Sequence, residues 1–190
     1  MSSIKRRHQI AAEETQGVIV AAAARLFFER GYQATSVAGI AAEAAVAVQT
    51  IYNSLGSKRD VLEHVLELST SDELATQDPD PDQIVEGWRA ALPTGARVSQ
   101  LLRDAAAVEP AIVQLERERR ERRLAEYETA AHALEQRGLL REGLTVRRAA
   151  ATMFALGHPE IYRELVLDGP WDDTLWATWA RSALRAALLA

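Results

Sequence analysis

Apolar side chains recur every three or four residues along most of this chain, which is the spacing of one face of an α-helix. The N-terminal third contains four such segments, with apolar positions at Ile19, Ala22, Ala23, Leu26 and Phe27, then Val37, Ile40, Ala41 and Ala44, then Val48 and Ile51, then Val61, Leu62, Val65, Leu66 and Leu68. They predict helices over residues 11–30, 37–44, 47–53 and 57–71. Gly31 and Gly56 are expected to end the first and third helices, because glycine adopts the left-handed backbone common at helix ends. Ser57 and Asp60 have the spacing of a capping box at the start of the fourth.

Residues 76–82, TQDPDPD, interrupt this pattern with two prolines and three aspartates. They have no apolar side chain to bury, so we expect a surface connection and place a domain boundary near residue 76. Beyond it the same periodicity predicts helices over residues 83–92, 95–108, 110–137, 145–156, 160–167 and 172–189. No segment alternates between apolar and polar residues for long enough to predict a strand. The expected fold is therefore all-α, with about nine or ten helices.

The composition is that of a globular protein, with 48% hydrophobic and 26% charged residues among 190. The absence of cysteine excludes disulfides, thiolate metal sites and thiol nucleophiles. The longest wholly apolar run, residues 18–24, is far shorter than the roughly 18 residues that span a bilayer, and no signal-peptide core is visible. We therefore expect a soluble protein of the cytoplasm.

The net charge of −5 is unevenly distributed, with +2 in residues 1–60 and −7 in residues 61–190. Lys5, Arg6 and Arg7 come before the first acidic residue, Glu13. Residues 1–10 are thus predicted to form a basic arm that reaches for phosphates, although an ordinary solvated terminus has the same composition.

The three short N-terminal helices, the third polar on its outer face, are what a helix-turn-helix unit requires. The segment AAAARLFFERGYQATSVAGIAAEAAVAVQTIYNSLGSKRDVLEHVL moreover resembles the N-terminal domain of the TetR family of transcriptional regulators. The resemblance runs from about Val18 to Leu66 and rests on Ala23, Leu26, Phe27, Gly31, Tyr32, Thr35, Ser36, Val37, Ile40, Ala41, Thr50, Ile51, Tyr52, Ser57 and Lys58.

This resemblance implies a DNA-binding role for the exposed residues around the predicted third helix. Tyr52 and Lys58 match positions that hold DNA phosphates in the family, and Thr35 and Thr50 match others that often do. Gln49 is the best candidate for reading bases, since its amide can pair with adenine. The full candidate set is Lys5, Arg6, Arg7, Thr35, Ser36, Val48, Gln49, Thr50, Tyr52, Asn53 and Lys58.

Three residues depart from the family pattern or from good helix chemistry. Ala45 stands where the turn usually has glycine, and Ala47 where a serine or threonine usually caps the third helix. The lost cap costs about 1 kcal/mol, and Gly39 inside the second helix costs about another 1 kcal/mol relative to alanine. The recognition unit is therefore expected to be fully ordered only on DNA.

The resemblance implies that residues 11–75 form the DNA-binding domain and that residues 76–190 form an effector-binding and dimerisation domain. The family dimerises through its last two long helices, here 145–157 and 172–189. Aromatic anchors are enriched at interfaces, and we favour an interface over pure core for the apolar residues of the last helix. The predicted interface residues are Leu175, Trp176, Trp179, Leu184 and Leu188.

Eight consecutive charges, Glu116 to Arg123, lie within the long helix predicted over residues 110–137. The simpler interpretation is a solvated face with Glu116–Arg120 and Glu118–Arg122 pairs. Eight residues exceed two turns, however, and the stripe through Ile112 and Leu115 projects onto Arg119 and Arg122. At least one arginine should therefore approach the domain interior or the DNA-binding domain. An acidic effector would suit an arginine that lines a cavity, whereas an arginine paired with an acid of the first or fourth helix would be a coupling contact. The candidate ligand-binding residues, each also a plausible core residue, are Trp88, Leu102, Arg119, Arg122, Tyr127, His132, Met153 and His158.

The sequence thus predicts a homodimeric repressor that leaves a palindromic operator when a small-molecule effector binds. An alternative is a ligand-binding or protein-interaction dimer whose DNA-binding domain has weakened. An enzyme is not expected, because no nucleophile with a base at a recognisable spacing, no phosphate loop and no histidine pair with a carboxylate for a metal is present. No cofactor and no membrane partner are expected.

Overall fold

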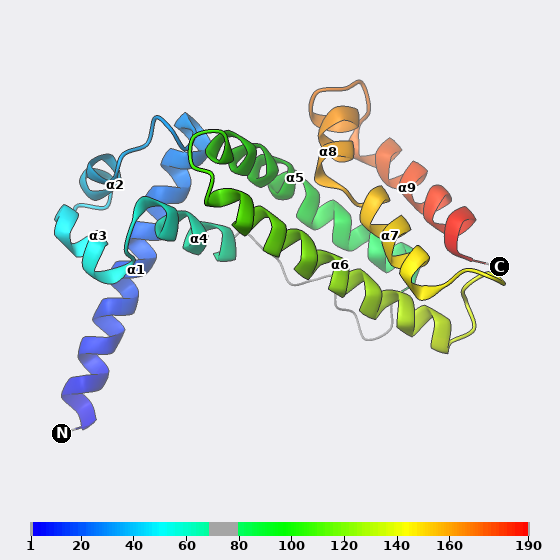
Figure 1. Cartoon of the computed structure of the whole chain (residues 1–190), viewed down its shortest axis with the longest axis horizontal. Helices are drawn as coiled ribbons and strands as arrows, with labels where there is room; N and C mark the ends of the chain where they lie inside the picture. Colours follow the sequence, from blue (N-terminus) through cyan, green and yellow to red (C-terminus); the bar gives the residue numbers. More distant parts are fainter. Residues whose placement is uncertain (1, 69–79, 190) are drawn as a thin grey trace. The chain divides into compact units, whose positions relative to one another are not determined.

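The computed structural model describes the backbone of residues 2–68 and 80–189 and the side chains of residues 10–67 and 80–189. Its elements are α1 (Ser2–Arg30), α2 (Val37–Glu43), α3 (Val48–Ser54), α4 (Lys58–Leu68), α5 (Pro81–Ala106), α6 (Ile112–Gln136), α7 (Val146–Leu156), α8 (Pro159–Tyr162), the π-helical turn η1 (Arg163–Leu167) and α9 (Asp173–Leu188) (Figure 1). Over these residues the only β-type pairing is an isolated bridge between Leu140 and Leu189. The predicted all-α fold is confirmed.

The chain divides into two compact units. The first comprises Met1–Ser69 together with Gln100–Val113, and the second comprises Thr70–Ser99 together with Gln114–Ala190. The boundary predicted near residue 76 lies outside the described residues. The inclusion of Gln100–Val113 in the first unit was not predicted, because a boundary drawn along the sequence cannot anticipate a segment that returns from further on.

In the first unit α1 packs against α2, α3 and α4 (Figure 1). Most of the apolar positions predicted from periodicity form the core, and Ile19, Ala23, Phe27, Ile40, Ile51 and Leu62 are at most 1% exposed. Gly31 and Gly56 adopt φ values of 82° and 93°, so both predicted helix ends are confirmed. The Oδ2 atom of Asp60 accepts hydrogen bonds from the backbone N–H and the hydroxyl of Ser57, at 2.8 and 2.7 Å, which fixes the first turn of α4 as a capping box.

The first helix is longer than predicted. α1 begins at Ser2 rather than near residue 11, so the segment predicted as an arm continues the helix. No glycine or proline precedes Gly17, and the intervening residues favour helix, so nothing in this stretch stops it. The side chains of Lys5, Arg6 and Arg7 lie outside the described ones, and their contact with DNA stays a prediction.

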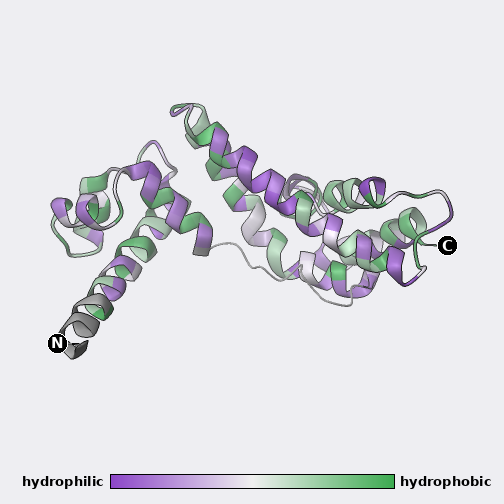
Figure 2. Cartoon of the chain, turned by 60° about the horizontal axis from the view of Figure 1, so that its bottom comes forward, coloured by the Kyte–Doolittle hydropathy of each residue, from purple (hydrophilic) through white to green (hydrophobic). Residues whose placement is uncertain are grey.

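The core of the second unit is built around four aromatic side chains. Trp88, Tyr127, Tyr162 and Trp176 are at most 4% exposed. The Trp176 ring packs edge-on against Tyr162 at 5.1 Å and tilted against Trp88 at 6.4 Å. α7 packs along α9 in the same unit, as Figure 1 shows. By contrast, hydrophilic residues follow the ribbon of α6 over much of its length (Figure 2).

The two helices predicted over residues 83–92 and 95–108 are a single helix, α5, with Pro93 inside it. A proline removes one backbone hydrogen bond, but the buried stripe of Trp88, Leu92 and Ala96 continues past it and favours continuous helix. Gly95 does not break α5 either. Gly95 lies next to the start of α8, where an added Cβ atom would be 3.4 Å from the Pro159 side chain, an ordinary contact distance.

Candidate DNA-binding site

The turn between α2 and α3 has an unusual backbone. Among the described residues other than glycine, only Ala45 has a positive φ, at 53°. α3 then begins after Ala47, which makes no side-chain capping bond. Ala45 therefore stands where glycine would adopt the left-handed backbone without strain, and Ala47 stands where the hydroxyl of serine or threonine would cap α3.

α3 presents its polar residues outward. Ile51 is fully buried, whereas Val48 and Tyr52 are 39% and 50% exposed, and Gln49 and Asn53 are exposed as well. The Gln49 amide donates a 2.8 Å hydrogen bond to Oδ1 of Asn53, one turn later. Four of the residues predicted to contact DNA, Val48, Gln49, Tyr52 and Asn53, are thus exposed on α3. The hydrogen bond to Asn53 holds the side-chain amide of Gln49 in place.

Thr35 and Ser36 have structural roles. Thr35 is only 3% exposed, and its hydroxyl lies 3.2 Å from the carbonyl oxygen of Leu26 and 2.9 Å from that of Gly31. The prediction that Thr35 contacts DNA is therefore corrected: its hydroxyl closes the end of α1. Ser36 is exposed, but its Oγ accepts a 3.0 Å hydrogen bond from the N–H of Gly39 as the N-cap of α2. Thr50 is half-buried.

Ser36 also explains Gly39. A Cβ atom at this position would lie 3.3 Å from the Ser36 Oγ, so the helix-propensity gain of alanine would be offset by crowding of the cap. We expect Gly39→Ala alone to change the free energy of unfolding by less than about 0.5 kcal/mol, whereas the same change in a Ser36→Ala background should stabilise by about 1 kcal/mol. Urea unfolding of the four proteins measures this cycle, and equal effects of Gly39→Ala in both backgrounds would contradict it.

A cluster of Tyr32, Lys58 and Glu109 lies beside α4. The Tyr32 hydroxyl donates a short hydrogen bond to Glu109, and the Lys58 ammonium lies 4.0 Å from the centroid of the Tyr32 ring. Burial, followed by the bond to Glu109, raises the pKa of Tyr32, and burial lowers the pKa of Lys58. The connection between α5 and α6 thus contacts Tyr32, and Tyr32 in turn lies against Lys58 in the first turn of α4. Sequence reasoning missed Glu109 because its partner Tyr32 is 77 residues away.

The predicted ligand-binding residues are not all brought together. Trp88, Tyr127 and Met153 lie in the core of the second unit, whereas Leu102 belongs to the first unit. Arg122 and His132 are exposed. His158 caps α8 by accepting a hydrogen bond from the N–H of Glu160 at 3.2 Å.

Two arginines of α6, Arg119 and Arg123, are half-buried. Periodicity pointed to Arg119 and Arg122. The inward face instead runs through Arg119, Arg123 and Tyr127, at intervals of four residues.

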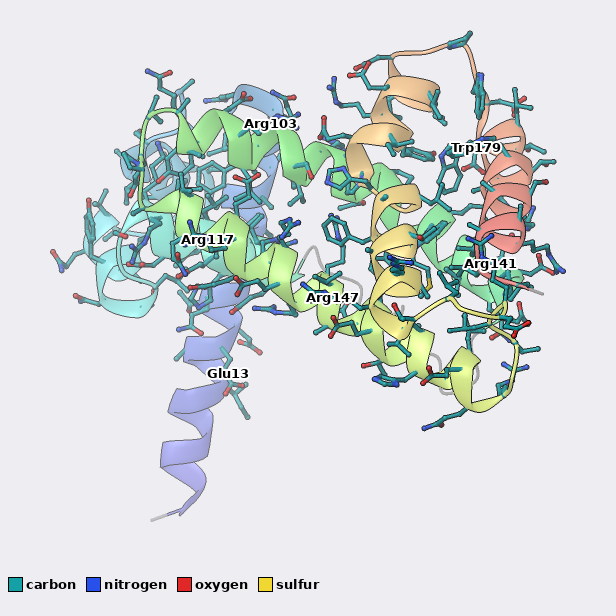
Figure 3. The ribbon with its side chains drawn as sticks, turned by 45° about the vertical axis from the view of Figure 1, so that its right-hand side comes forward. Glu13, Arg103, Arg117, Arg141, Arg147 and Trp179 are labelled. Atoms are coloured by element: carbon teal, nitrogen blue, oxygen red, sulfur yellow. The ribbon has the colours of Figure 1, made fainter. Side chains whose placement is uncertain are left out.

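The residues predicted for an interface on α9 divide into two groups. Trp176, Leu184 and Leu188 are 0% exposed in the core of their own unit, so their prediction as interface residues is corrected. Leu175 is 50% exposed, and Trp179 is half-buried, with its ring 5.7 Å from that of Trp171 (Figure 3). For these two the interface stays a prediction.

Within the described part of the chain, no three histidine, aspartate or glutamate side chains gather in a way that could hold a metal ion. No helix there combines the length and apolar character that crossing a membrane requires.

Comparison with known proteins agrees with this geometry. Residues 19–65 match the family described as bacterial regulatory proteins, tetR family. No curated protein has a matching sequence. Three solved structures are similar to this chain over most of its length.

A putative TetR-family transcriptional regulator from Mesorhizobium loti is 20% identical, with 92% of this chain and 95% of that chain covered and a TM-score of 0.74. SmeT in complex with triclosan is 22% identical, with coverage of 93% and 92% and a TM-score of 0.72. NalD, the secondary repressor of the MexAB-OprM multidrug efflux pump in Pseudomonas aeruginosa, is 21% identical, with coverage of 94% and 98% and a TM-score of 0.70. Residues 19–65, which include the helix-turn-helix of α2 and α3, therefore match the tetR family in sequence, and the chain over most of its length has the fold of TetR-family transcriptional regulators.

Proposed function

We propose that this regulator is a homodimeric repressor that binds a palindromic operator and is released from it by a small-molecule effector. The observation that carries the proposal is the outward face of α3, where Gln49, Tyr52 and Asn53 are exposed while Ile51 anchors the helix. A short helix with a buried anchor and polar residues at its N-terminal end suits entry into the major groove. NalD is a repressor and SmeT binds triclosan, and both activities are proposed here for this chain by similarity of fold.

The N-terminal and C-terminal parts of the chain would divide this work. The protein would act in the cytoplasm, where its DNA is. Residues 11–75 would bind DNA, with phosphates held by Tyr52, Lys58 and the basic residues of the first turns of α1. Residues 76–190 would bind the effector and form the dimer through exposed side chains of α9, among them Leu175 and Trp179. Dimerisation would set the two copies of α3 about 34–36 Å apart, one turn of DNA.

Release would work by a population shift in which α4 moves. Val61, Leu62 and Val65 of α4 are fully buried, so the helix can move only as a packed body together with its neighbours in the first unit. The contacts of Tyr32 with Glu109 and Lys58 connect the segment after α5 to the first turn of α4. An effector must favour the released state by about 5.5 kcal/mol to empty a nearly full operator.

Gln49→Ala is expected to lower affinity for the preferred operator about tenfold while leaving affinity for scrambled DNA unchanged, because a base contact specifies and a phosphate contact does not. Fluorescence anisotropy on fragments selected from genomic DNA, at several salt concentrations, measures both affinities. Gln100→Ala is the matched control, since Gln100 also donates a 2.8 Å hydrogen bond one turn along an exposed helical face, to Asp104. Equal losses on both DNAs would show that Gln49 does not read bases.

A dimer with a weakened DNA-binding domain is the second candidate, and the unfavourable turn at Ala45 and uncapped Ala47 favour it. It predicts a stable dimer for which fragment selection recovers no preferred site. Recovery of one preferred sequence, bound more weakly as salt rises, would exclude it.

A further inference from the structure

The second unit contains an unexpected group of cations on α6. The guanidinium carbon of Arg123 lies 4.4 Å from the centroid of the Phe154 ring on α7, and that of Arg120 lies 5.2 Å from the same centroid. Neither of the predicted pairs with Glu116 and Glu118 is formed within the described chain, where Glu118 instead accepts a 2.9 Å hydrogen bond from Gln114. The arginines are directed to an aromatic ring rather than to carboxylates.

Arg123 is the member of this group with an unsatisfied donor. Its Nε atom is buried, and no hydrogen-bond acceptor reaches it among the described residues. A buried donor without a partner costs stability, and natural cores seldom retain one without a role.

The local charges are also unbalanced. Burial is the main cause that lowers the pKa of Arg119 and of Arg123, and neighbouring arginines lower both further, whereas Glu126 acts in the opposite direction on both. The half-buried guanidinium groups of Arg119 and Arg123 are thus each repelled by at least one neighbouring arginine. An additional anion would relieve this repulsion.

The surroundings of Arg123 are aromatic and ordered. Phe154 packs edge-on against Tyr127 at 6.2 Å and against His158 at 5.7 Å. The Tyr127 hydroxyl accepts a 2.9 Å hydrogen bond from the indole N–H of Trp88, and burial raises the pKa of Tyr127 to about 12, so it stays protonated. Gly157 allows this packing, because a Cβ atom there would overlap both Trp88 and the Tyr127 hydroxyl. Side chains from α5, α6, α7 and the start of α8 thus pack around Tyr127 and Phe154, and Arg123 lies over the Phe154 ring.

We propose that Arg123 binds the carboxylate of an apolar monocarboxylic acid, and that this acid is the effector of the regulator. The inference rests on the proposed function and names the class of its ligand. A carboxylate can accept from Nε and one Nη of a guanidinium at once, which supplies the acceptor that Nε lacks. The aromatic side chains of Tyr127 and Phe154 suit the apolar body of the acid, and a dianionic phosphate would be far costlier to remove from water in the same place.

The covered Nε also gives the ligand a way to act. Because the side chains around it leave no access, a carboxylate can reach it only when α6 and α7 adjust in the second unit. The acid therefore binds an altered conformation more tightly than the one described, which is the condition for shifting a conformational equilibrium.

Calorimetry of the full-length protein with octanoate and benzoate, and with octanamide and benzamide as neutral counterparts of the same shape, tests the proposal. At least one carboxylate should bind, and its amide should bind about tenfold to a hundredfold more weakly. Arg123→Gln should weaken carboxylate binding by the same factor, while Arg117→Gln, an exposed arginine of the same helix, should have no effect (Figure 3). If neither carboxylate binds at millimolar concentration, or if amides bind equally well, the proposal is overturned.

The comparison of acid with amide uses the unaltered protein, so it tests carboxylate binding even if Arg123→Gln does not fold. The assay also contains no DNA, which separates this inference from the regulatory one. Carboxylate binding that depends on Arg123, combined with the absence of a preferred operator, would retain the ligand site and reject the repressor. Selective operator binding without carboxylate binding would retain the repressor and reject the ligand site.

Discussion

Trp176→Ala is expected to lower the free energy of unfolding by about 3–5 kcal/mol, the cost of deleting a large, fully buried aromatic side chain. Trp176 is 0% exposed and touches Tyr162 and Trp88. Its indole N–H has no hydrogen-bond partner among the described residues, so the loss comes from packing and from the cavity that remains. Urea denaturation followed by circular dichroism measures the change.

Leu175→Ala is the matched control, because it removes an apolar side chain from the preceding position of α9, where half of the residue is exposed. We expect it to change the stability by less than about 1 kcal/mol, as most surface substitutions do. At low protein concentration, Leu175→Ala should promote dissociation of the proposed dimer, whereas Trp176→Ala should chiefly destabilise the unit itself. The reverse result, a stable Trp176→Ala protein that fails to self-associate, would restore Trp176 to the interface.

This contrast shows what helical periodicity can and cannot predict. The spacing of Trp176, Leu184 and Leu188 correctly placed them on one face of a helix, but it carries no information on which surface covers that face. In the structure α7 and the aromatic core of the same unit cover it. The residues of α3 were easier to predict, because a short helix with one buried position, Ile51, leaves its remaining faces exposed.

Contacts distant in sequence account for most of what was missed. Glu109 accepts the hydrogen bond of Tyr32, and Arg123 stacks on Phe154, and neither pairing leaves a local pattern. The charged run of α6 was identified correctly as too long for all of it to face solvent. Of the two arginines predicted to face inward, Arg119 is half-buried, whereas Arg122 is exposed and Arg123 is half-buried in its place. A helix turns by 100° per residue, so a stripe extrapolated over two turns can fall on either of two neighbours.

Ala45→Gly combined with Ala47→Ser is expected to stabilise the first unit by about 2 kcal/mol. Relief of the left-handed backbone at Ala45 contributes about 1 kcal/mol, and a hydroxyl cap at the start of α3 contributes about another 1 kcal/mol. The first contribution rests on the φ of 53° at Ala45, and the second rests on the missing side-chain cap at Ala47. Urea unfolding measures the sum, and the single variants measure each part.

Ala42→Gly supplies a control of opposite sign. Ala42 is exposed within α2, where its backbone is helical, so glycine there should destabilise by about 1 kcal/mol. If Ala45→Gly destabilises as Ala42→Gly does, the turn is not held in the left-handed conformation. If the double variant is more stable and also binds its operator more tightly, the wild-type α3 is only partly ordered without DNA, because ordering it in advance removes a cost that binding otherwise has to overcome. A more stable protein with unchanged operator affinity would mean instead that α3 is already ordered before it meets DNA.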